Sequence, residues 1–510
     1  MKKKLFGFLF AVMVSLLVVP VVNVLSVPDG KPIKWHEKGF LYNVDFVSAL
    51  SSALLYPLGI STDPEQVVIG RDGWLYLGDK YENARSVVRS GASPEDKDSG
   101  KRIGEAAAAW ETYLSSRGVR LYRVLVGPNK ESIYPDYLPD WARGASPSAA
   151  DVILAGAGSV RYVDLRRPLQ EARKTYSAPL YYKTDTHWNQ LGGAVAFQYF
   201  AEVVGADAPE LAWPSKSSYQ VSGVAPRIGG DLANFLRISS HLSDLEPTPN
   251  ASGLPVTTER IDFNTSAVIS SGGNLPVGSP SKPLLIRASG ALNSKRVLWL
   301  RDSFGTAMSP LMAATFSEVL QLHWLEALKP GGNFVQLVES WRPDYVFITV
   351  VERSVGSGVF AFFPPPVVVP RGGDFKPTLV GTVNRMNDLD KGHSANEYKI
   401  TGRDPFVEFS IANASAQSGP GLLNIDLTCN DGSVSAPIQI FWLGNDAPRY
   451  DEENSVRLTF SAGSNLIDLR TIKKLHPSIV VKRIRLDIDS KDSCRSFKLR
   501  DIVLGNGSGT

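Results

Sequence analysis

The chain has 510 residues, a length that suggests about three compact units. Hydrophobic residues make up 43% and charged residues 21%, values that exclude a disordered chain, a collagen-like repeat and a multi-span membrane protein. The 54 basic and 51 acidic residues leave a net charge of +3, which gives no support for nucleic-acid binding. With only two cysteines, the chain is neither a disulfide-stapled scaffold nor a Cys-ligated zinc protein.

An apolar segment behind three lysines begins the chain. Positions 2–4 are lysine, and an apolar run follows from Leu5 to about Leu25. This pattern predicts a secretion signal or a signal anchor over residues 1–26. The run is near the length that spans a bilayer as a helix, although Pro20 and Asn23 weaken its last turns. Cleavage and retention both stay open, and with either one we expect the rest of the chain to be exported.

Export also bears on the two cysteines, Cys429 and Cys494. Both lie in the last part of the chain, so a disulfide between them would link parts of one C-terminal unit. Two free, buried thiols are the alternative.

Helical and extended patterns alternate over residues 27–375, which predicts an α/β unit built on a doubly wound parallel sheet. A strand–turn–strand pattern covers 67–77, and further strands are expected at 121–126, 162–165, 295–300 and 341–351. Helices are expected at 103–117, 168–174 and 189–204, with a polar loop at 89–100. Residues 206–285 are rich in Ser, Pro and Gly, and we expect an irregular insertion or lid there.

The pattern changes after a proline-rich, linker-like stretch at 363–373. Over residues 385–510, short segments alternate apolar and polar residues between turn residues, which predicts an all-β sandwich or jelly roll. The expected strands are 406–411, 438–442, 455–460, 484–488 and 497–504.

An Asp-x-His pair, Asp185 and His187, lies in a loop just ahead of the expected helix at 189–204. A carboxylate two residues before an imidazole can accept its Nδ1 proton and leave Nε2 free as a general base. The alternative is a structural one, in which Asp185 helps to cap the helix and His187 packs locally.

A serine, Ser303, follows the expected strand at 295–300 directly and precedes a helix-compatible stretch. A serine at such a turn lies at the carboxyl edge of the sheet, where the active sites of α/β proteins are found. Its alternative role is an N-cap. Since a serine nucleophile needs a base and the base needs an orienting group, the two segments together favour a Ser303–His187–Asp185 triad. Asp302, beside the serine, is expected to point elsewhere.

Thr184-Asp-Thr-His-Trp-Asn189, followed by Arg301-Asp-Ser-Phe-Gly305, resembles the alginate O-acetyltransferase AlgJ/AlgX family of SGNH-hydrolase-like enzymes. Further agreement is found in Gly70-Arg-Asp-Gly-Trp-Leu-Tyr76, Pro128-Asn-Lys130, Tyr134-Pro135, Gly230-Asp-Leu232 and Glu352-Arg353. The similarity spans residues 65–355 and has the acid–base pair before the serine, as in that family. One departure is the serine box, which reads R-D-S-F-G here and is of the G-T-S type in AlgJ and AlgX.

The resemblance implies an SGNH-like fold and a periplasmic enzyme, free or anchored to the inner membrane, that acetylates an exopolysaccharide. Ser303 would be the nucleophile, His187 the general base and acid, and Asp185 the group that orients His187. A membrane-bound O-acyltransferase would supply the acetyl group within an exopolysaccharide synthesis and export complex. By the same resemblance, the C-terminal β unit would hold the glycan or act as a lid.

Four more residues are candidates for substrate binding: Asn129, Lys130, Trp188 and Arg353. Each also has a structural alternative, as a turn residue, an ion-pair partner or a core residue, and Glu352 with Arg353 is expected to form a structural pair. No H-E-x-x-H, CxxC, P-loop or post-strand G-x-G-x-x-G is present, so no metal or cofactor is predicted. A polysaccharide esterase with the same triad and a non-catalytic glycan-binding component remain the alternative functions.

Overall fold

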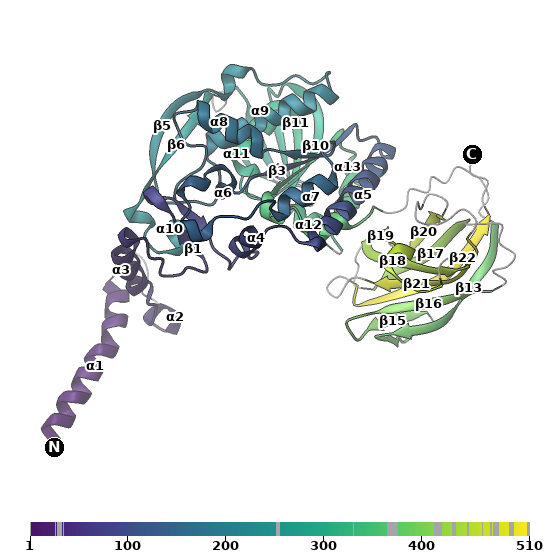
Figure 1. Ribbon diagram of the computed structural model, residues 1–510, viewed down its shortest axis with the longest axis horizontal. Helices are drawn as coiled ribbons and strands as arrows, with labels where there is room; N and C mark the ends of the chain where they lie inside the picture. The colour runs from purple at the N-terminus through teal and green to yellow at the C-terminus, as the bar shows by residue number, and fades with distance from the viewer. Residues whose placement is uncertain are drawn as a thin grey trace.

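The computed structural model describes residues 2–25, 27, 33, 35–250, 255–329, 331–364, 376–394, 396–412, 421–430, 435–445, 448–461, 463–469, 472, 479–488 and 494–506. Figure 1 shows a helix, α1 (Lys2–Leu25), that projects from an α/β region, and an all-β region formed by the C-terminal part of the chain. Most of the expected linker at 363–373 lies outside the described residues.

An eight-stranded sheet forms the centre of the α/β region. In spatial order its strands are β4 (Tyr162–Asp164), β3 (Leu121–Gly127), β12 (Tyr345–Val351), β10 (Asn293–Arg301), β11 (Phe316–Leu322), β9 (Leu284–Ser289), β7 (Thr257–Asp262) and β8 (Val268–Gly273). The first five pair in parallel, as the alternating pattern predicted. The last three are antiparallel, so the sheet is mixed.

Helices cover both faces of this sheet (Figure 1). On one face lie α5 (Pro94–Ser116), α7 (Ala149–Ala157), α12 (Trp324–Leu328) and α13 (Phe334–Trp341), and on the other α8 (Arg166–Thr175), α9 (Gln190–Asp207) and α11 (Gly305–Thr315). Successive residues of a strand point to opposite faces of the sheet. In β12, Phe347 belongs to the hydrophobic cluster that includes α9, and Ile348 belongs to the cluster that includes α5. Burial on both faces explains why β12 is almost entirely apolar, with Thr349 as its one polar aliphatic residue.

Helix α5 begins earlier than the sequence pattern indicated. It starts at Pro94, inside the stretch 89–100 that was expected to be a loop. Ser93 and Asp96 form a capping box, in which each side chain accepts a hydrogen bond from the other residue's backbone N–H. The polar first turns of α5 are therefore helical because a local cap satisfies their backbone donors.

The segment 206–285 is not irregular as expected, because it contains four strands. Two of them, β5 (Val221–Ile228) and β6 (Ser243–Pro249), form an antiparallel hairpin of their own, while β7 and β8 extend the central sheet. Another hairpin, β1 (Val67–Ile69) with β2 (Leu75–Leu77), confirms the strand–turn–strand pattern at 67–77.

The C-terminal region is all-β, as predicted. Its strands are β13 (Lys376–Asn387), β14 (Leu389–Lys391), β15 (Glu397–Ile400), β16 (Phe406–Ile411), β17 (Leu422–Cys429), β18 (Ser435–Gly444), β19 (Ser455–Ser461), β20 (Gly463–Asp468), β21 (Val481–Ile488) and β22 (Ser496–Asn506). All pairs are antiparallel, and β13 pairs with both β16 and β22. A disulfide joins Cys429 at the end of β17 to Cys494 just before β22, which decides between the two expected states of these cysteines.

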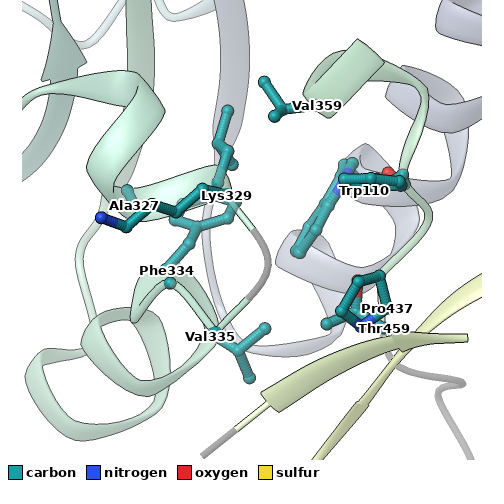
Figure 2. Close-up of a pocket in the computed structure, with 12 residues that line it drawn as sticks. Trp110, Ala327, Lys329, Phe334, Val335, Val359, Pro437 and Thr459 are labelled. Carbon is teal, nitrogen blue, oxygen red and sulfur yellow. The ribbon is translucent and has the colours of Figure 1, made fainter. Parts of the chain in front are cut away.

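A pocket lies between the two regions (Figure 2). Trp110 and Phe334 of the α/β region face it from one side, and Pro437 and Thr459 of β18 and β19 from the other. Its lining contains none of the residues that the sequence predicts to be catalytic.

Candidate active site

Asp185 and His187 lie in a short loop that is closed at its base. Tyr181 and Trp188 pair as an isolated antiparallel bridge, and the loop leads directly into α9. The cap of α9 is Asn189, whose side chain accepts a hydrogen bond from Gly192 N at 3.0 Å. Asp185 therefore does not cap the helix, and its carboxylate is available to hydrogen-bond to His187.

Ser303 lies in the turn between β10 and α11, at the carboxyl end of a central strand. The neighbouring Asp302 fixes this turn: its carboxylate accepts from Phe304 N at 2.9 Å and from Val351 N, at the end of β12, at 2.7 Å. Trp324 Nε1 lies 3.3 Å from the same carboxylate. Asp302 therefore points away from His187 and ties two adjacent strand ends together, as expected.

The structure joins the serine, the histidine and the aspartate in one chain of hydrogen bonds. His187 Nδ1 lies 2.7 Å from Asp185 Oδ1, and His187 Nε2 lies 2.8 Å from Ser303 Oγ. Because Nδ1 faces a carboxylate, the neutral ring carries its proton there, and Nε2 can accept the proton of the serine hydroxyl. Ser303 is 116 positions away from His187 in the sequence, so the fold creates this contact.

The electrostatics of the site suit a general base. Burial lowers the pKa of His187, but the hydrogen bond and charge of Asp185, with the charge of Asp231, outweigh burial and raise it above 6.5. For Asp185, burial raises the pKa, but the hydrogen bond and charge of His187 outweigh it and hold the pKa well below its ordinary value. Asp185 is therefore ionised under all ordinary conditions, and it stabilises a protonated His187.

The β5–β6 hairpin and the residues that connect its strands supply a second group of side chains, around the loop that holds Asp185 and His187. Asp231 accepts hydrogen bonds from Thr186 N at 2.7 Å and from the Thr186 hydroxyl, and its Oδ2 lies 3.6 Å from His187 Nδ1. Asp244 accepts from Thr184 N and Thr184 Oγ1 at 2.8 and 2.7 Å. These carboxylates hold the backbone on either side of Asp185.

Arg227 of β5 approaches the loop from the same hairpin. Its guanidinium lies 3.7 Å from Asp185 Oδ2 and stacks 4.0 Å from the centre of the Tyr182 ring. Asp231 belongs to the Gly-Asp-Leu box that the sequence analysis noted, but Arg227 and Asp244 carried no signal in the sequence. Their roles follow from a hairpin in a segment that was expected to be irregular.

Lys130 holds the backbone of the loop that contains Asp185 and His187. Only 3% exposed, it donates to the carbonyl oxygens of Tyr182, Lys183 and Asp185 at 3.1, 3.0 and 2.7 Å. Burial lowers its pKa to about 8, although Asp231, Asp185 and Asp244 counteract part of this effect. Since an ammonium has three protons and all three have acceptors here, this geometry makes Lys130 a positioning residue. It gives no support to the expectation that Lys130 binds substrate.

Trp188 is also placed in the interior. It is 2% exposed, its Nε1 donates to Phe304 O at 2.8 Å, and its ring packs edge-on against that of Phe304. The ring has no free face on which a sugar could stack. Trp188 thus links the loop of His187 to the turn of Ser303, and this geometry gives no support to the expectation that it binds substrate.

Asn129 follows β3 and Arg353 follows β12, two adjacent strands of the sheet, and both residues line a small pocket beside Thr186. Arg353 contacts Asn129 Oδ1 at 3.4 Å and lies 3.2 Å from Glu82. The expected pairing of Arg353 with Glu352 is not found, because the two side chains have different partners. Glu352 accepts from Asn129 N at 2.8 Å and from Ser132 Oγ at 2.7 Å, and burial raises its pKa to about 7.

Within the described residues, Asp185, His187 and Asp231 bring possible metal ligands within 4.8 Å of one another. Each of these ligand atoms already has a hydrogen-bond partner in the site: Asp185 with His187, and Asp231 with Thr186. The close approach of these three side chains is therefore explained by the hydrogen bonds that hold His187 and its loop.

Comparison with known proteins agrees with the resemblance noted in the sequence. Residues 67–267 match the family model described as SGNH hydrolase-like domain, acetyltransferase AlgX. This segment includes Asp185, His187 and Asp231, and Ser303 lies beyond it. A shorter match, to the N-terminal part of strictosidine synthase-like proteins, covers residues 48–80.

Curated relatives include two proteins named probable alginate O-acetylase AlgJ. The one from Pseudomonas syringae pv. tomato is 30% identical over 191 residues, and the one from Pseudomonas aeruginosa is 28% identical over 192 residues. Each alignment covers 36% of this chain and 44% of the relative, so the chain spans less than half the length of the curated relatives it matches.

Among solved structures, AlgX of Pseudomonas aeruginosa matches with a TM-score of 0.39 and 13% identity, over 87% of this chain and 95% of AlgX. The O-acetyltransferase domain of Pseudomonas putida AlgJ matches with a TM-score of 0.34 and 18% identity, over 57% of this chain and 92% of that domain. The resemblance seen in the sequence motifs is thus confirmed by the family model: residues 67–267 are similar to the SGNH hydrolase-like acetyltransferase domain of AlgX.

Proposed function

We propose that the protein is an exported O-acetyltransferase that transfers acetyl groups to hydroxyls of an exopolysaccharide through an acetyl-serine intermediate. The observation that carries this proposal is the hydrogen-bond chain from Asp185 through His187 to Ser303, with both distances under 3 Å. The match of residues 67–267 to an acetyltransferase domain, and the relatives named alginate O-acetylase, support transfer to a polysaccharide.

The first half-reaction loads the serine. His187 takes the Ser303 hydroxyl proton as Oγ attacks the acetyl carbonyl of the donor. The resulting tetrahedral intermediate collapses, and the donor's leaving group departs with the proton that His187 returns. Asp185 stabilises the imidazolium that exists between these two proton transfers.

The second half-reaction uses the same residues in the same order. A sugar hydroxyl gives its proton to His187 and attacks the acetyl-serine carbonyl. The ester bond to Ser303 breaks, Oγ regains a proton from His187, and the acetylated sugar leaves. An enzyme of this kind needs no bound metal for either step, because the leaving and attacking groups are both served by one imidazole.

Two donors are suited to stabilise the oxyanion of each intermediate. The Phe304 N–H is already bonded to Asp302, whereas the Ser303 N–H has no acceptor within the described part of the chain. Asn129 is the second donor, because contact between its Oδ1 and Arg353 leaves its NH₂ group for the substrate. Each such donor contributes about 3–4 kcal/mol to transition-state stabilisation in comparable sites.

We further propose a periplasmic location with α1 retained as an inner-membrane anchor. Helix α1 contains 21 residues, Leu5–Leu25, that are apolar and long enough to cross a membrane. In this location a membrane-bound O-acyltransferase would supply the acetyl group, within a complex that makes and exports the polysaccharide. The C-terminal β region would hold the glycan chain.

The test compares acetyl transfer with acetyl hydrolysis. Purified full-length protein is incubated with a soluble acetyl ester, with and without an oligosaccharide acceptor, and the acetyl group is followed by mass spectrometry. Acetylated sugar is the expected product. Acetate released without any acetylated sugar would instead identify an esterase.

The matched variants are Ser303→Ala and Ser240→Ala. Ser240 Oγ also lies near a histidine nitrogen, 3.2 Å from His241 Nδ1, but this pair is exposed and has no carboxylate partner. Ser303→Ala should lower the rate by at least about 10³-fold, and Ser240→Ala should leave it unchanged. Polysaccharide acetylation that continues unchanged in cells carrying Ser303→Ala would favour a non-catalytic, glycan-binding role.

A further inference from the structure

Helix α3 (Asp45–Leu55) has its apolar side turned away from the protein. Val47, Leu50 and Leu54 are 44%, 62% and 67% exposed, and Leu58, in the short helical turn that follows, is 70% exposed. Their spacing of three, four and four residues places them in one stripe along the helix. The stripe is therefore a continuous apolar surface that the described chain leaves uncovered.

The other sides of α3 are less exposed: Phe46, Ala49 and Leu55 are half-buried, and polar side chains add contacts to the rest of the protein. Asp45 pairs with Arg237 at 3.0 Å, and Ser52 Oγ lies 2.6 Å from Thr62 Oγ1. Ser52 is the buried residue of this helix. A helix on the surface of a water-soluble protein normally buries its apolar stripe against the core. Helix α3 instead leaves its largest apolar side chains, Leu50 and Leu54, mostly exposed, which indicates that this side meets a non-aqueous environment.

The position of α3 identifies this environment. The Asn23 side chain, in the last turn of α1, donates to Leu41 O at 2.9 Å and to Asn43 O at 2.8 Å, just before α3 begins. In Figure 1, α3 accordingly lies at the junction of α1 and the α/β region. If α1 crosses the bilayer, its C-terminal end and the start of α3 lie at the same membrane surface.

Two exposed aromatic residues lie between the helices. Trp35 is 58% exposed and Tyr42 is 61% exposed. Tryptophan and tyrosine are enriched at the level of the lipid headgroups, where one end of the ring is apolar and the other is hydrated. Both residues lie in the segment of the chain that joins α1 to α3, where a membrane surface would be.

We propose that the stripe Val47, Leu50, Leu54 and Leu58 lies in the headgroup region of the bilayer that α1 crosses, so that α3 is an interfacial helix. The occupant of this surface is lipid, because the stripe begins next to the end of the membrane-spanning segment, where Asn23 contacts the residues just before α3. The inference rests on the proposed retention of α1 and is independent of the chemistry at Ser303. Its consequence is a fixed orientation of the α/β region on the membrane.

The chain itself makes a site-specific test possible. Its two cysteines are joined in a disulfide, so an introduced cysteine is the one thiol that a dye can label. Full-length protein with Leu50→Cys or Leu54→Cys is labelled with an environment-sensitive dye and reconstituted, one chain per disc, into phospholipid nanodiscs. The matched controls are Ser48→Cys on another side of the same helix, Val160→Cys in an exposed loop of the α/β region, and Leu16→Cys in α1.

Dyes at 50, 54 and 16 should shift to shorter emission wavelengths and be quenched several-fold by spin-labelled lipid, and dyes at 48 and 160 should not. Equal quenching at 54 and 48 would overturn the inference. A wavelength shift at 54 without quenching by lipid would also overturn it, because a protein surface and not lipid would then cover the stripe.

A charged variant supplies an independent check. Leu54→Glu should reduce the quenching at position 50 several-fold, whereas Ser48→Glu should not. The same samples are assayed for hydrolysis of a soluble acetyl ester. Loss of lipid contact with intact hydrolysis would count against the membrane inference alone, and lipid contact without Ser303-dependent hydrolysis would count against the proposed reaction alone.

Discussion

The carboxylate of Asp231 lies 3.6 Å from Nδ1 of His187, on the nitrogen that Asp185 already binds at 2.7 Å. Two carboxylates therefore act on one imidazole. The charge of Asp231 adds to that of Asp185 in raising the pKa of His187. Burial, followed by repulsion from Asp185, raises the pKa of Asp231 itself. With both carboxylates present, the imidazole is protonated more easily than it would be beside one aspartate. In the proposed reaction, Asp231 would therefore help to set the pH range of activity.

We predict that Asp231→Asn shifts the pH–rate profile to lower pH. His187 must be neutral to accept a proton, so the rate should rise as pH increases through the pKa of His187, which lies above 6.5 in the native protein. Removing the Asp231 charge lowers this pKa, and more of the histidine is then neutral near pH 6. Initial rates of acetyl-ester hydrolysis between pH 5 and 9 measure the shift.

The asparagine variant retains an oxygen that can accept a hydrogen bond from Thr186. It therefore removes the charge of Asp231 while keeping a contact that holds the loop. Asp231→Ala, which removes both, should lower the rate at every pH. A profile of Asp231→Asn that is unchanged, or moved to higher pH, would contradict the electrostatic role of Asp231.

Gly230→Ala should abolish most of the activity while the protein remains folded. A methyl group at this position would overlap Cβ and Oδ2 of Asp185, which would displace the carboxylate that orients His187. Gly223→Ala, on the same hairpin, is the matched control because its added methyl meets no atom within 4 Å. Steady-state rates and circular dichroism of both variants provide the comparison. Equal activity of the two variants would show that the Gly230–Asp185 contact does not constrain the site.

Lys130→Met should lower kcat and leave the KM for the acceptor nearly unchanged. The variant keeps the hydrocarbon stem but removes the donor to the Tyr182 and Asp185 carbonyl oxygens, whereas the Lys183 oxygen still accepts from Leu75 N at 2.8 Å. We expect a loss of about 1–3 kcal/mol in unfolding free energy, since unsatisfied buried acceptors cost about that much. Kinetics with a varied oligosaccharide concentration separate the roles. A higher KM with an unchanged kcat would identify Lys130 as a substrate-binding residue.

Replacing both Cys429 and Cys494 by serine should destabilise the β region and spare the reaction at Ser303. The disulfide links residues 65 positions apart, and loss of such a link typically costs about 2–5 kcal/mol. Denaturant unfolding of the full chain, with and without reductant, measures this change. The native protein should respond to reductant, and the double variant should not. An unchanged unfolding midpoint in the double variant would rule out a stabilising role for the disulfide.

The fold was predictable where a pattern extended over a whole element. Strands β3 and β12 are nearly continuous apolar runs, because both of their faces are buried, and this makes them conspicuous in the sequence. The antiparallel strands β7 and β8, at one end of the sheet, were missed. Strand β8 is exposed along its length and contains two serines and two glycines, so it carries little of the apolar signal on which strand prediction depends.

The start of α5 was missed for a different reason. Its first turns are polar, and helix formation there depends on the capping box of Ser93 and Asp96 and not on an apolar periodicity. A capping box can in principle be recognised in a sequence. Here, however, the surrounding residues have a composition that is typical of loops, and that composition favoured the wrong prediction.

The sequence by itself determined which residues could do the chemistry: an Asp-x-His pair ahead of a helix and a serine at the end of a strand. Only the tertiary structure decided how the remaining polar residues are used. Lys130 and Trp188 became supports of the loop, and Asp231, Asp244 and Arg227 joined the site from a distant hairpin. The reason is physical. Residue type fixes what a side chain can donate, accept or titrate, but its partners depend on which segments packing brings within about 3 Å of it.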